Sequence, residues 1–451
     1  MPENDSKSNF PPHDDLPRDH IPERGEQTGP LDVPQQDLGE NFVTLEDRML
    51  ARRSVPIRHM IPDDDALEGQ SAQAEIREAA GLDSVHGAPK RKGKRTSESI
   101  WSRRWRRFKG LKRGYFAFLL LALLYGLSFL LPVIVNNKAL YVSYNGNSYF
   151  PAVADLFDFL PGVDSFYPSS TFGQSSEYGE GEAVYRKLKD EFEAAGGGNT
   201  VIMPLYPWEP NEIDFELNRH PNDPGSLHVL GTDDSGRDVL ARLLYGFNVS
   251  ISFALVLTFI SYLLGIAVGS IMGYFGGKLD LIGQRFVEIW ENLPFLYIVI
   301  IISAIIQPNF IILVVILALF QWIGISYYIR GEFFREKSKD YVSAAISLGA
   351  STPSIIFKHI LPNSLTPIIT FYPFALIGGI NVLVALDFLG FGLPGTVPSW
   401  GELLNRGLGN LEFWWLVVPP LVALFFTLML VTFIGEAVRE AFDPKVFSRL
   451  R

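Results

Sequence analysis

The sequence predicts an all-α polytopic membrane protein with six transmembrane helices, a small α+β extracytoplasmic insertion and a disordered N-terminal tail. Three observations carry this prediction: six long apolar runs, Lys and Arg on alternate connections between them, and a polar, Pro-rich first hundred residues. The chain has 451 residues, of which 47% are hydrophobic, and no cysteine. Disulfides, thiolate metal sites and cysteine nucleophiles are therefore excluded.

Residues 1–100 are rich in Pro, Asp, Glu, Gln and Arg and show no sustained helical or strand period. Such a composition cannot bury enough apolar surface to offset the entropy lost on ordering, so we expect disorder with at most a short helix at 66–80. The first strong apolar run begins near residue 115, too late for a cleaved secretory signal. We expect it to be a retained membrane helix.

A basic segment directly precedes the first apolar run. Trp101, Trp105 and Phe108 recur in it at helical spacing. A basic helix with an aromatic face suits the cytoplasmic headgroup region of a membrane. A plain positive flank explains the charge equally well, and the adjoining span argues against nucleic-acid binding. The basic residues are Arg103, Arg104, Arg106, Arg107, Lys109, Lys112 and Arg113.

Six apolar runs are long enough to cross a hydrocarbon core of about 30 Å, which takes roughly 20 helical residues. The basic flank places the N-terminus in the cytoplasm, and alternation then puts the loops 275–285 and 330–364 and the C-terminal tail inside. These inside segments are rich in Lys and Arg, whereas the short outside connections hold only Arg406. The predicted spans are 115–135, 249–274, 286–306, 310–329, 365–387 and 413–435.

Residues 136–230 fall outside the membrane in this topology. Asn145 and Gly146 tolerate positive φ and separate two short alternating runs, which predicts a β-hairpin. Residues 182–195 predict a short helix that three glycines, 196–198, bring to an end. The segment is therefore expected to be an α+β insertion, too small for a full ligand-binding domain.

The inside loop 330–364 predicts two short helices bent at Gly349, because glycine accepts a left-handed backbone at little cost. The second helix is expected to begin at a Thr352 cap and to close at Pro362. Alanine side chains let another backbone approach, so this element either docks into a partner or lies on the membrane as an amphipathic loop. The face expected on the first helix consists of Tyr341, Ala344, Ala345 and Leu348.

The run from Tyr341 to Asn363 resembles the coupling loop of ABC importer permeases, which reads roughly Glu-Ala-Ala, three residues, Gly and, further on, Ile-Leu-Pro. The resemblance implies that this loop contacts a separate ATPase. Ser343 stands where the family usually has Glu, so one ion pair with the ATPase is expected to be missing. The coupling residues implied by the resemblance are Ala344, Ala345, Gly349, Ile360, Leu361 and Pro362.

A second motif, residues 231–238, resembles the Gly-Thr-Asp…Gly-Arg-Asp signature that precedes the second span of dipeptide and oligopeptide permeases. Asp233 and Arg237 are one helical turn apart, and apolar residues follow from Leu240. This pattern predicts a helix lying in the outer interface, which serves either as a structural elbow or as a substrate contact. The motif residues are Gly231, Thr232, Asp233, Gly236, Arg237 and Asp238.

A third motif runs from Asp387 to Pro394 and continues as Pro-Ser-Trp-Gly-Glu to Glu402. It is similar to the family sequence after the fifth span. Repeated Gly and Pro cannot continue a helix, and irregular backbone at membrane depth is tolerated only against protein or water. The turn therefore either borders the pathway or is a tight re-entrant connection. The pathway candidates are Asp387, Gly390, Gly392 and Pro394.

No Gly-x4-Gly-Lys-Ser/Thr phosphate loop occurs in the sequence, so ATP hydrolysis is expected in another chain. Glu288 and Glu291 lie in the predicted third span, where an ionisable residue is a functional candidate. Both are near its inner end, which favours a solvated or ion-paired structural role. A proton relay would need ionisable pairs at mid-membrane, and none recurs there.

The resemblance covers about 115–445, and three separated motifs agree on it. The hairpin-bearing insertion and the ending 433–444 look most like the Yej branch, the microcin C and oligopeptide importers. The resemblance implies a type I ABC importer permease that moves peptides across the cytoplasmic membrane by alternating access and is not itself an enzyme. Metals and cofactors are not expected in this chain, while ATP and Mg²⁺ are expected in the partner ATPases. The implied partners are a second homologous permease, two ABC ATPase domains, an extracytoplasmic peptide-binding protein, the peptide and membrane lipid.

The expected domains are a tail (1–100), a basic segment with the first span (101–135), the insertion with an interfacial helix (136–246), a five-helix permease domain (247–440) and a C-terminal tail (441–451). An ion-coupled secondary transporter is the main alternative, and it predicts charged or broken-helix sites at mid-membrane. A membrane scaffold is a third, and it leaves the coupling-loop motif unexplained.

Overall fold

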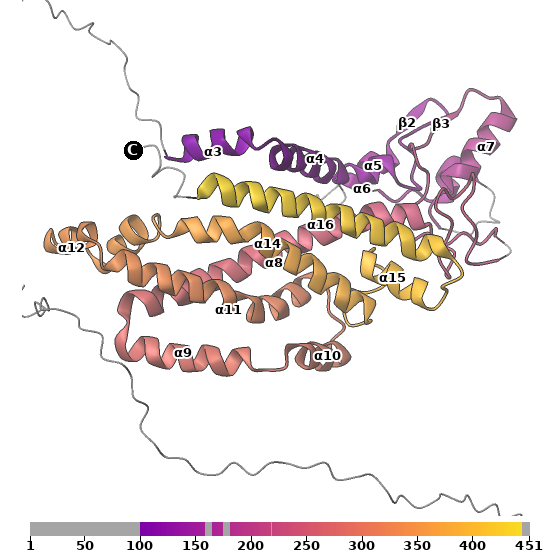
Figure 1. Cartoon of the computed structure of the whole chain (residues 1–451). Helices are drawn as coiled ribbons and strands as arrows, with labels where there is room; N and C mark the ends of the chain where they lie inside the picture. Colours follow the sequence, from indigo (N-terminus) through magenta and orange to yellow (C-terminus); the bar gives the residue numbers. More distant parts are fainter. Residues whose placement is uncertain (1–99, 158–164, 175–180, 218, 444–451) are drawn as a thin grey trace, which may run out of the picture. The chain divides into compact units, whose positions relative to one another are not determined.

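Long apolar helices form the body of the described chain in the computed structural model (Figure 1). Four are long and apolar enough to cross a membrane, and the number among the described residues rises to six if each of two bent helix pairs is one span. The six predicted spans agree with the upper number. The four long helices are α8 (Val239–Phe275), α11 (Phe310–Lys337), α14 (Leu365–Phe388) and α16 (Trp414–Phe442).

The tail predicted at 1–100, with its short helix at 66–80, lies outside the described residues apart from its last position. The residues that the structure describes are 100–157, 165–174, 181–217 and 219–443.

Two helix pairs are sharply bent. α3 (Ile100–Gly110) and α4 (Lys112–Ser128) meet at 96°, and α9 (Gly277–Glu291) and α10 (Phe295–Ile305) meet at 67°. The single third-span helix predicted at 286–306 is therefore wrong. Proline has no N–H donor and disfavours helical backbone in the residue before it, so Pro294 separates α9 from α10.

The first two spans also differ from their predicted bounds. α4 ends at Ser128, and a separate short helix, α5 (Leu131–Ile134), follows with a proline in its first turn. α8 begins at Val239, well before the predicted start at 249, because the Asp238 side chain caps it by accepting a hydrogen bond from Ala241 N at 2.7 Å. The separate interfacial helix predicted here is the first part of α8.

Glycine allows α8 and α11 to pack at short range. A Cβ atom placed on Gly269 would lie 2.5 Å from the Ser326 carbonyl oxygen, and one on Gly273 would lie 2.6 Å from Phe333 Cβ. No side chain fits at such distances, so glycine at these two positions sets the spacing of the two helices.

α9 is joined to α11 by a bidentate ion pair. Arg330 donates from Nε to Asp280 Oδ1 at 2.5 Å and from a terminal nitrogen to Oδ2 at 2.7 Å. On the same helix, Glu288 pairs with Arg285 and Glu291 accepts from Tyr327, both at exposed positions. Exposed pairs of this kind are typically worth less than about 1 kcal/mol. The two glutamates therefore fit the structural role that the sequence favours.

The segment between the first span and α8 is an α+β insertion with a three-stranded sheet in the order β2-β1-β3. β1 (Tyr141–Tyr144) and β2 (Asn147–Tyr149) form the predicted hairpin, with Asn145 and Gly146 at φ 50° and 81°. β3 (Thr200–Ile202) pairs antiparallel with the other side of β1, which the sequence did not predict.

A compact core supports this sheet. The predicted short helix is α7 (Tyr185–Ala195), which starts a few residues later than expected and ends at Gly196, with φ 60°. Its buried side chains pack with Val142 and Phe172 under the sheet. Two short helices, α6 (Pro151–Leu156) and η3 (Ser169–Phe172), complete the described part of the insertion.

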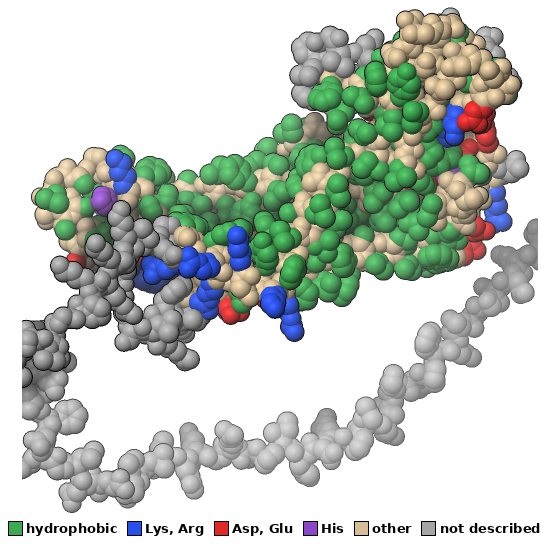
Figure 2. Space-filling view, turned by 90° about the horizontal axis from the view of Figure 1, so that it is seen from above, with side chains coloured by type: hydrophobic (Ala, Val, Ile, Leu, Met, Phe, Trp, Pro, Cys, Tyr) green, Lys and Arg blue, Asp and Glu red, His purple; other side chains and the backbone are tan. Residues whose placement is uncertain are grey.

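The two ends of the helical body carry different elements (Figure 1). One end holds α12 (Asp340–Ser347), α3 and the last turns of α16, and the other holds α15 (Trp400–Leu408) and the insertion. The described chain thus enters and leaves at the same end. Figure 2 shows Lys and Arg side chains gathered toward that end of the apolar surface.

Candidate functional site

The predicted bent element is present at the end of the body that carries α12. α12 ends at Ser347, Gly349 has φ +80°, and α13 (Thr352–Ser354) continues directly into the π-helical η5 (Ile355–Ile360). The predicted Thr352 cap is wrong by one position. Ser351 has the extended backbone of an N-cap, and Thr352 and Pro353 form the first turn.

The face predicted on α12 is divided between two sides of the helix. Ala345 is 8% exposed and Ile360 is fully buried, so both pack inside the permease. Leu348 is 88% exposed, and Ala344, Gly349 and Pro362 are also exposed. Sequence reasoning missed two further exposed apolar side chains here, Ile346 and Phe357.

A buried carboxylate holds the bent element to the end of α11. Glu336, 5% exposed, accepts from Lys339 Nζ at 2.6 Å and from the Tyr341 hydroxyl at 2.7 Å. The Asn363 amide donates to the same hydroxyl and to the His359 carbonyl at 2.7 Å. Burial and the nearby Glu336 raise the pKa of Tyr341 to about 12, so it remains a donor at neutral pH. The Tyr341 hydroxyl therefore links the start of the bent element to Glu336 on α11 and to Asn363 at its end.

At the opposite end, residues 231–238 form a loop, so the helix predicted around Asp233 and Arg237 is wrong. Gly231 and Gly236 have φ +69° and +85°, which a regular helix does not allow. Asp233 Oδ1 accepts from Ser235 N at 2.9 Å and from Arg237 N at 3.0 Å, and Oδ2 accepts from Arg237 Nε at 2.8 Å. The side chain of Asp233 thus shapes the loop.

This loop is joined to α15 by a buried charge cluster around Glu402. Arg237 donates to Glu402 Oε1 at 2.9 Å and Arg242 donates to Oε2 at 2.6 Å, while Arg406 pairs with Glu402 and Asp234. Burial alone would raise the pKa of Glu402, but Arg242, Arg406 and Arg237 together lower it. Glu402 is therefore ionised at neutral pH.

A second buried cluster lies behind the same loop. His228, 1% exposed, has Nδ1 at 2.8 Å from Asp238 Oδ2 and Nε2 at 3.2 Å from Asp214 Oδ2. Burial opposes protonation of His228, but the two carboxylates outweigh it and raise its pKa. Asp238 also accepts from the Tyr206 hydroxyl at 2.5 Å and caps α8. The insertion and α8 therefore share one carboxylate.

Sequence reasoning gave no role to seven members of these clusters: Tyr206, Asp214, His228, Asp234, Arg242, Glu402 and Arg406. The only available signal was position: Glu402 ends the third motif, and Arg242 lies shortly after the second. Nothing in the sequence indicates that these two residues pair.

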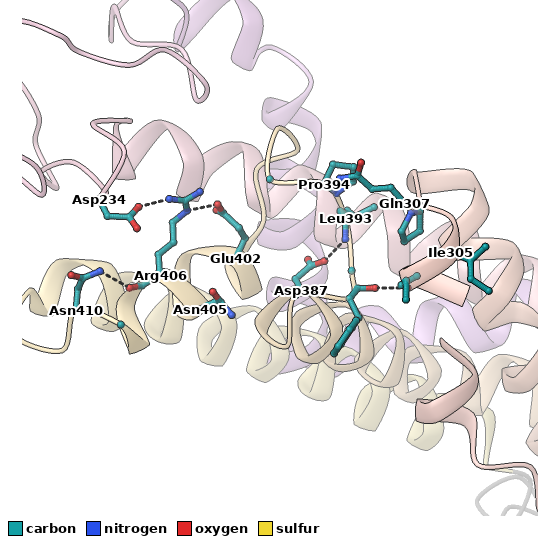
Figure 3. Close-up of a pocket in the computed structure, with 18 residues that line it drawn as sticks. Asp234, Ile305, Gln307, Asp387, Leu393, Pro394, Glu402, Asn405, Arg406 and Asn410 are labelled. Carbon is teal, nitrogen blue, oxygen red and sulfur yellow. Dashed lines mark hydrogen bonds and ion pairs between the residues drawn. The ribbon is translucent and has the colours of Figure 1, made fainter. Parts of the chain in front are cut away.

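The Gly- and Pro-rich turn after α14 borders a cavity of about 880 Å³ (Figure 3). Asp387 is 5% exposed and accepts from Leu393 N at 2.7 Å, while Ser303 on α10 donates to the Phe391 carbonyl at 3.0 Å. All four predicted pathway candidates line this cavity. Its other polar lining residues are Asp234, Ser303, Gln307, Glu402, Asn405, Arg406 and Asn410.

The cavity and the bent element lie at opposite ends of a bundle that crosses a membrane several times. A polar recess lies at one end of this bundle, and an exposed apolar surface lies at the other. These features fit a membrane permease.

Comparison with known proteins identifies the family. The model of the family described as "Binding-protein-dependent transport system inner membrane component" matches residues 265–448. The chain is 41% identical over 344 residues to the inner membrane ABC transporter permease protein YejE of Escherichia coli (strain K12), covering 76% of this chain and 96% of the relative. The chain belongs to the binding-protein-dependent ABC transporter permeases.

Two further relatives agree. The chain is 40% identical over 355 residues to the peptidoglycan transport system permease protein YejE of Agrobacterium fabrum (strain C58 / ATCC 33970), covering 76% of this chain and 92% of the relative. It is 34% identical to the oligopeptide transport system permease protein OppC of Haemophilus influenzae (strain ATCC 51907 / DSM 11121 / KW20 / Rd), covering 54% and 79%. The protein is a multi-pass inner-membrane permease subunit of an ABC transporter, and the ATPase is in separate subunits.

Proposed function

We propose that this permease imports peptides or peptide-like compounds, including peptidoglycan fragments, through a pore shared with a second homologous permease. The main support is that both ends of the bundle carry family motifs, one on an exposed contact surface and one on a polar cavity. Relatives named for peptide, oligopeptide and peptidoglycan transport support the substrate class.

The proposed orientation puts both termini in the cytoplasm. The described chain enters and leaves at the end that carries α12 and gathers Lys and Arg, and positive charge favours the cytoplasmic side (Figures 1 and 2). The insertion and the cavity then face outward. We propose as domains the N-terminal tail, the basic segment with the first span, an outer insertion up to 238, a permease domain that begins at Val239, and the C-terminal tail; the start of α8 supports the boundary at Val239.

At the cytoplasmic end, we assign ATPase contact to Ala344, Leu348, Gly349 and Pro362, which are exposed. Ala345, Ile360 and Leu361 act as the inner support of this surface, since the first two are buried and Leu361 packs against the same core. ATP and Mg²⁺ would bind the two partner ATPases. Glu336 and Tyr341 join the bent element to α11, and Asn363 is bound to the same hydroxyl. A force that the ATPase exerts on the element would therefore move the element and α11 as a rigid unit.

At the outer end, the cavity is the proposed entry to the pathway, lined by Asp387, Gly390, Gly392 and Pro394. The motif residues Thr232, Asp233 and Arg237 are buried and paired, so their proposed role is to hold the rim. An extracytoplasmic peptide-binding protein would deliver substrate here.

Reconstitution tests this function. Proteoliposomes containing the permease pair, the ATPases and the binding protein are expected to transport a labelled peptide only when ATP is present on the side of the membrane that the ATPases face. Matched vesicles without the ATPase, under a proton or sodium gradient, are expected to show no uptake. Uptake driven by the gradient alone would instead establish an ion-coupled transporter.

A further inference from the structure

α3 carries a dense positive charge to which the proposed transport function assigns no role. The sequence from 100 to 113 contains seven Lys and Arg residues and no Asp or Glu. α3 is bent by 96° from α4, so it does not continue the line of the first span. Five charged residues on α3 itself exclude it from the hydrocarbon.

One side of α3 is attached to the end of α16. Phe108 is buried against Ala437 and Ala441, and Trp101 packs edge-on against Phe442. On the same side, Arg104 lies 4.7 Å above the Phe442 ring and Arg107 is 3.9 Å from Glu440. The protein thus holds α3 in a fixed orientation.

The remaining surface has two distinct flanks. Trp105 is 50% exposed and contacts Phe118, which is itself partly exposed on α4, so this flank continues the apolar surface of the first span. Residues two positions apart on a helix are about 200° apart around its axis. Arg103 therefore lies on the flank opposite Trp105.

Four cations of this segment are exposed and form no ion pair with any residue that the structure describes: Arg103, Lys109, Lys112 and Arg113. Lys109 Nζ lies 5.6 Å from the Trp105 ring, above the apolar flank. A cation directly above an aromatic side chain at a membrane boundary is the arrangement that meets a phosphate headgroup.

We propose that α3 is an in-plane helix that binds anionic phospholipid in the leaflet it faces. Trp105 enters the acyl boundary, and Arg103, Lys109, Lys112 and Arg113 bind headgroup phosphates. Arg104 also donates to Thr366 Oγ1 at 3.4 Å, at the start of α14, directly after the bent element. Bound lipid therefore steadies the base of the helices that carry the coupling loop.

The chain has no cysteine, so single labels can be placed without background. In the assembled transporter, nitroxides at Trp105→Cys and Arg103→Cys would be compared for collision with oxygen and with a water-soluble nickel chelate. Position 105 is expected to be shielded from nickel and open to oxygen, and position 103 the reverse. Equal nickel access at both positions would overturn the in-plane placement.

Lipid selectivity is measured separately with spin-labelled phosphatidylglycerol and phosphatidylcholine in mixed vesicles. Arg103→Gln/Lys109→Gln is expected to lower the preference for phosphatidylglycerol by about fivefold per charge removed. Lys187→Gln/Lys189→Gln on α7 removes the same charge elsewhere and is expected to leave it unchanged. An equal effect of both variants, or displacement of the lipid by inorganic phosphate at matched ionic strength, would contradict a headgroup site. Neither readout depends on ATP hydrolysis or on peptide uptake, so a failure of the proposed transport function would leave both measurements interpretable.

Discussion

Arg237 donates to Glu402 Oε1 at 2.9 Å and joins two motifs that are 165 residues apart in the chain. Glu402 also pairs with Arg242 and Arg406, so a single carboxylate holds the 231–238 loop, the first turn of α8 and α15 together. The outer rim of the proposed pathway therefore depends on one acidic side chain.

Replacing Glu402 should loosen this rim. Glu402→Gln leaves Arg242 buried without its ion-pair partner and leaves Arg237 with Asp233 alone, and breaking a buried pair in this way costs about 3–5 kcal/mol. A clear fall in thermal unfolding temperature in detergent is expected. Glu412→Gln, at an exposed position, is the control and should change stability by less than about 0.5 kcal/mol. Equal melting of both variants would refute the role of Glu402.

His228 should make stability depend on pH. Because its folded pKa is raised above the ordinary value near 6.5, its contribution is fully present below the unfolded pKa and is lost as pH rises through the folded pKa. The facing groups are Asp214, Asp238 and, through Asp238, Tyr206. The melting-temperature difference between wild type and His228→Gln should therefore shrink as the pH rises above 6.5. His359→Gln is the control, and a difference independent of pH would contradict this assignment.

Gly269 should not tolerate even alanine. Its Cβ would lie 2.5 Å from the Ser326 carbonyl oxygen, and overpacking of this kind typically costs about 1–3 kcal/mol. Gly331→Ala in α11 meets no atom within 4 Å and should be neutral or stabilising by up to about 1 kcal/mol. Thermal unfolding of the two variants gives the comparison. If Gly269→Ala melts like Gly331→Ala, the helices do not pack as closely as described.

Replacing Gly349 should impair transport while the protein still folds. Gly349→Val forces a β-branched residue into a backbone with φ +80°, which such residues resist. The expected result is loss of ATPase pull-down or of ATP-driven uptake. Gly349→Asn, which accepts positive φ more readily, should retain most of both. Normal pull-down and uptake by the Val variant would count against docking at the bend.

Local chemistry made part of the fold predictable. The Asn145–Gly146 turn, the end of α7 at Gly196 and the bend at Gly349 each follow from a residue that accepts positive φ. The break before α10 was not predicted as a break, although Pro294 marks it. Apolar runs give the number of spans well and their bounds less well, because caps such as Asp238 decide where a helix begins.

Contacts between distant segments were not predictable in the same way. The pairing of β3 with β1 and the meeting of Arg242 with Glu402 depend on how the chain returns to itself. Sequence spacing suggested that Asp233 and Arg237 pair across a helical turn, and they do pair, but through a loop. The residue types predicted the ion pair correctly, whereas the helical backbone predicted between the two residues was wrong.

Cross-linking from Leu348 tests the central claim most directly, since this side chain is 88% exposed on the proposed coupling surface and the chain has no cysteine. Leu348→Cys, carrying a short heterobifunctional linker in the assembled transporter, is expected to cross-link to the ATPase subunit and to block ATP-driven uptake. Phe215→Cys on the insertion, which is 85% exposed, should give no ATPase product. A cross-link to the ATPase from position 215 and none from 348 would contradict both the coupling surface and the orientation.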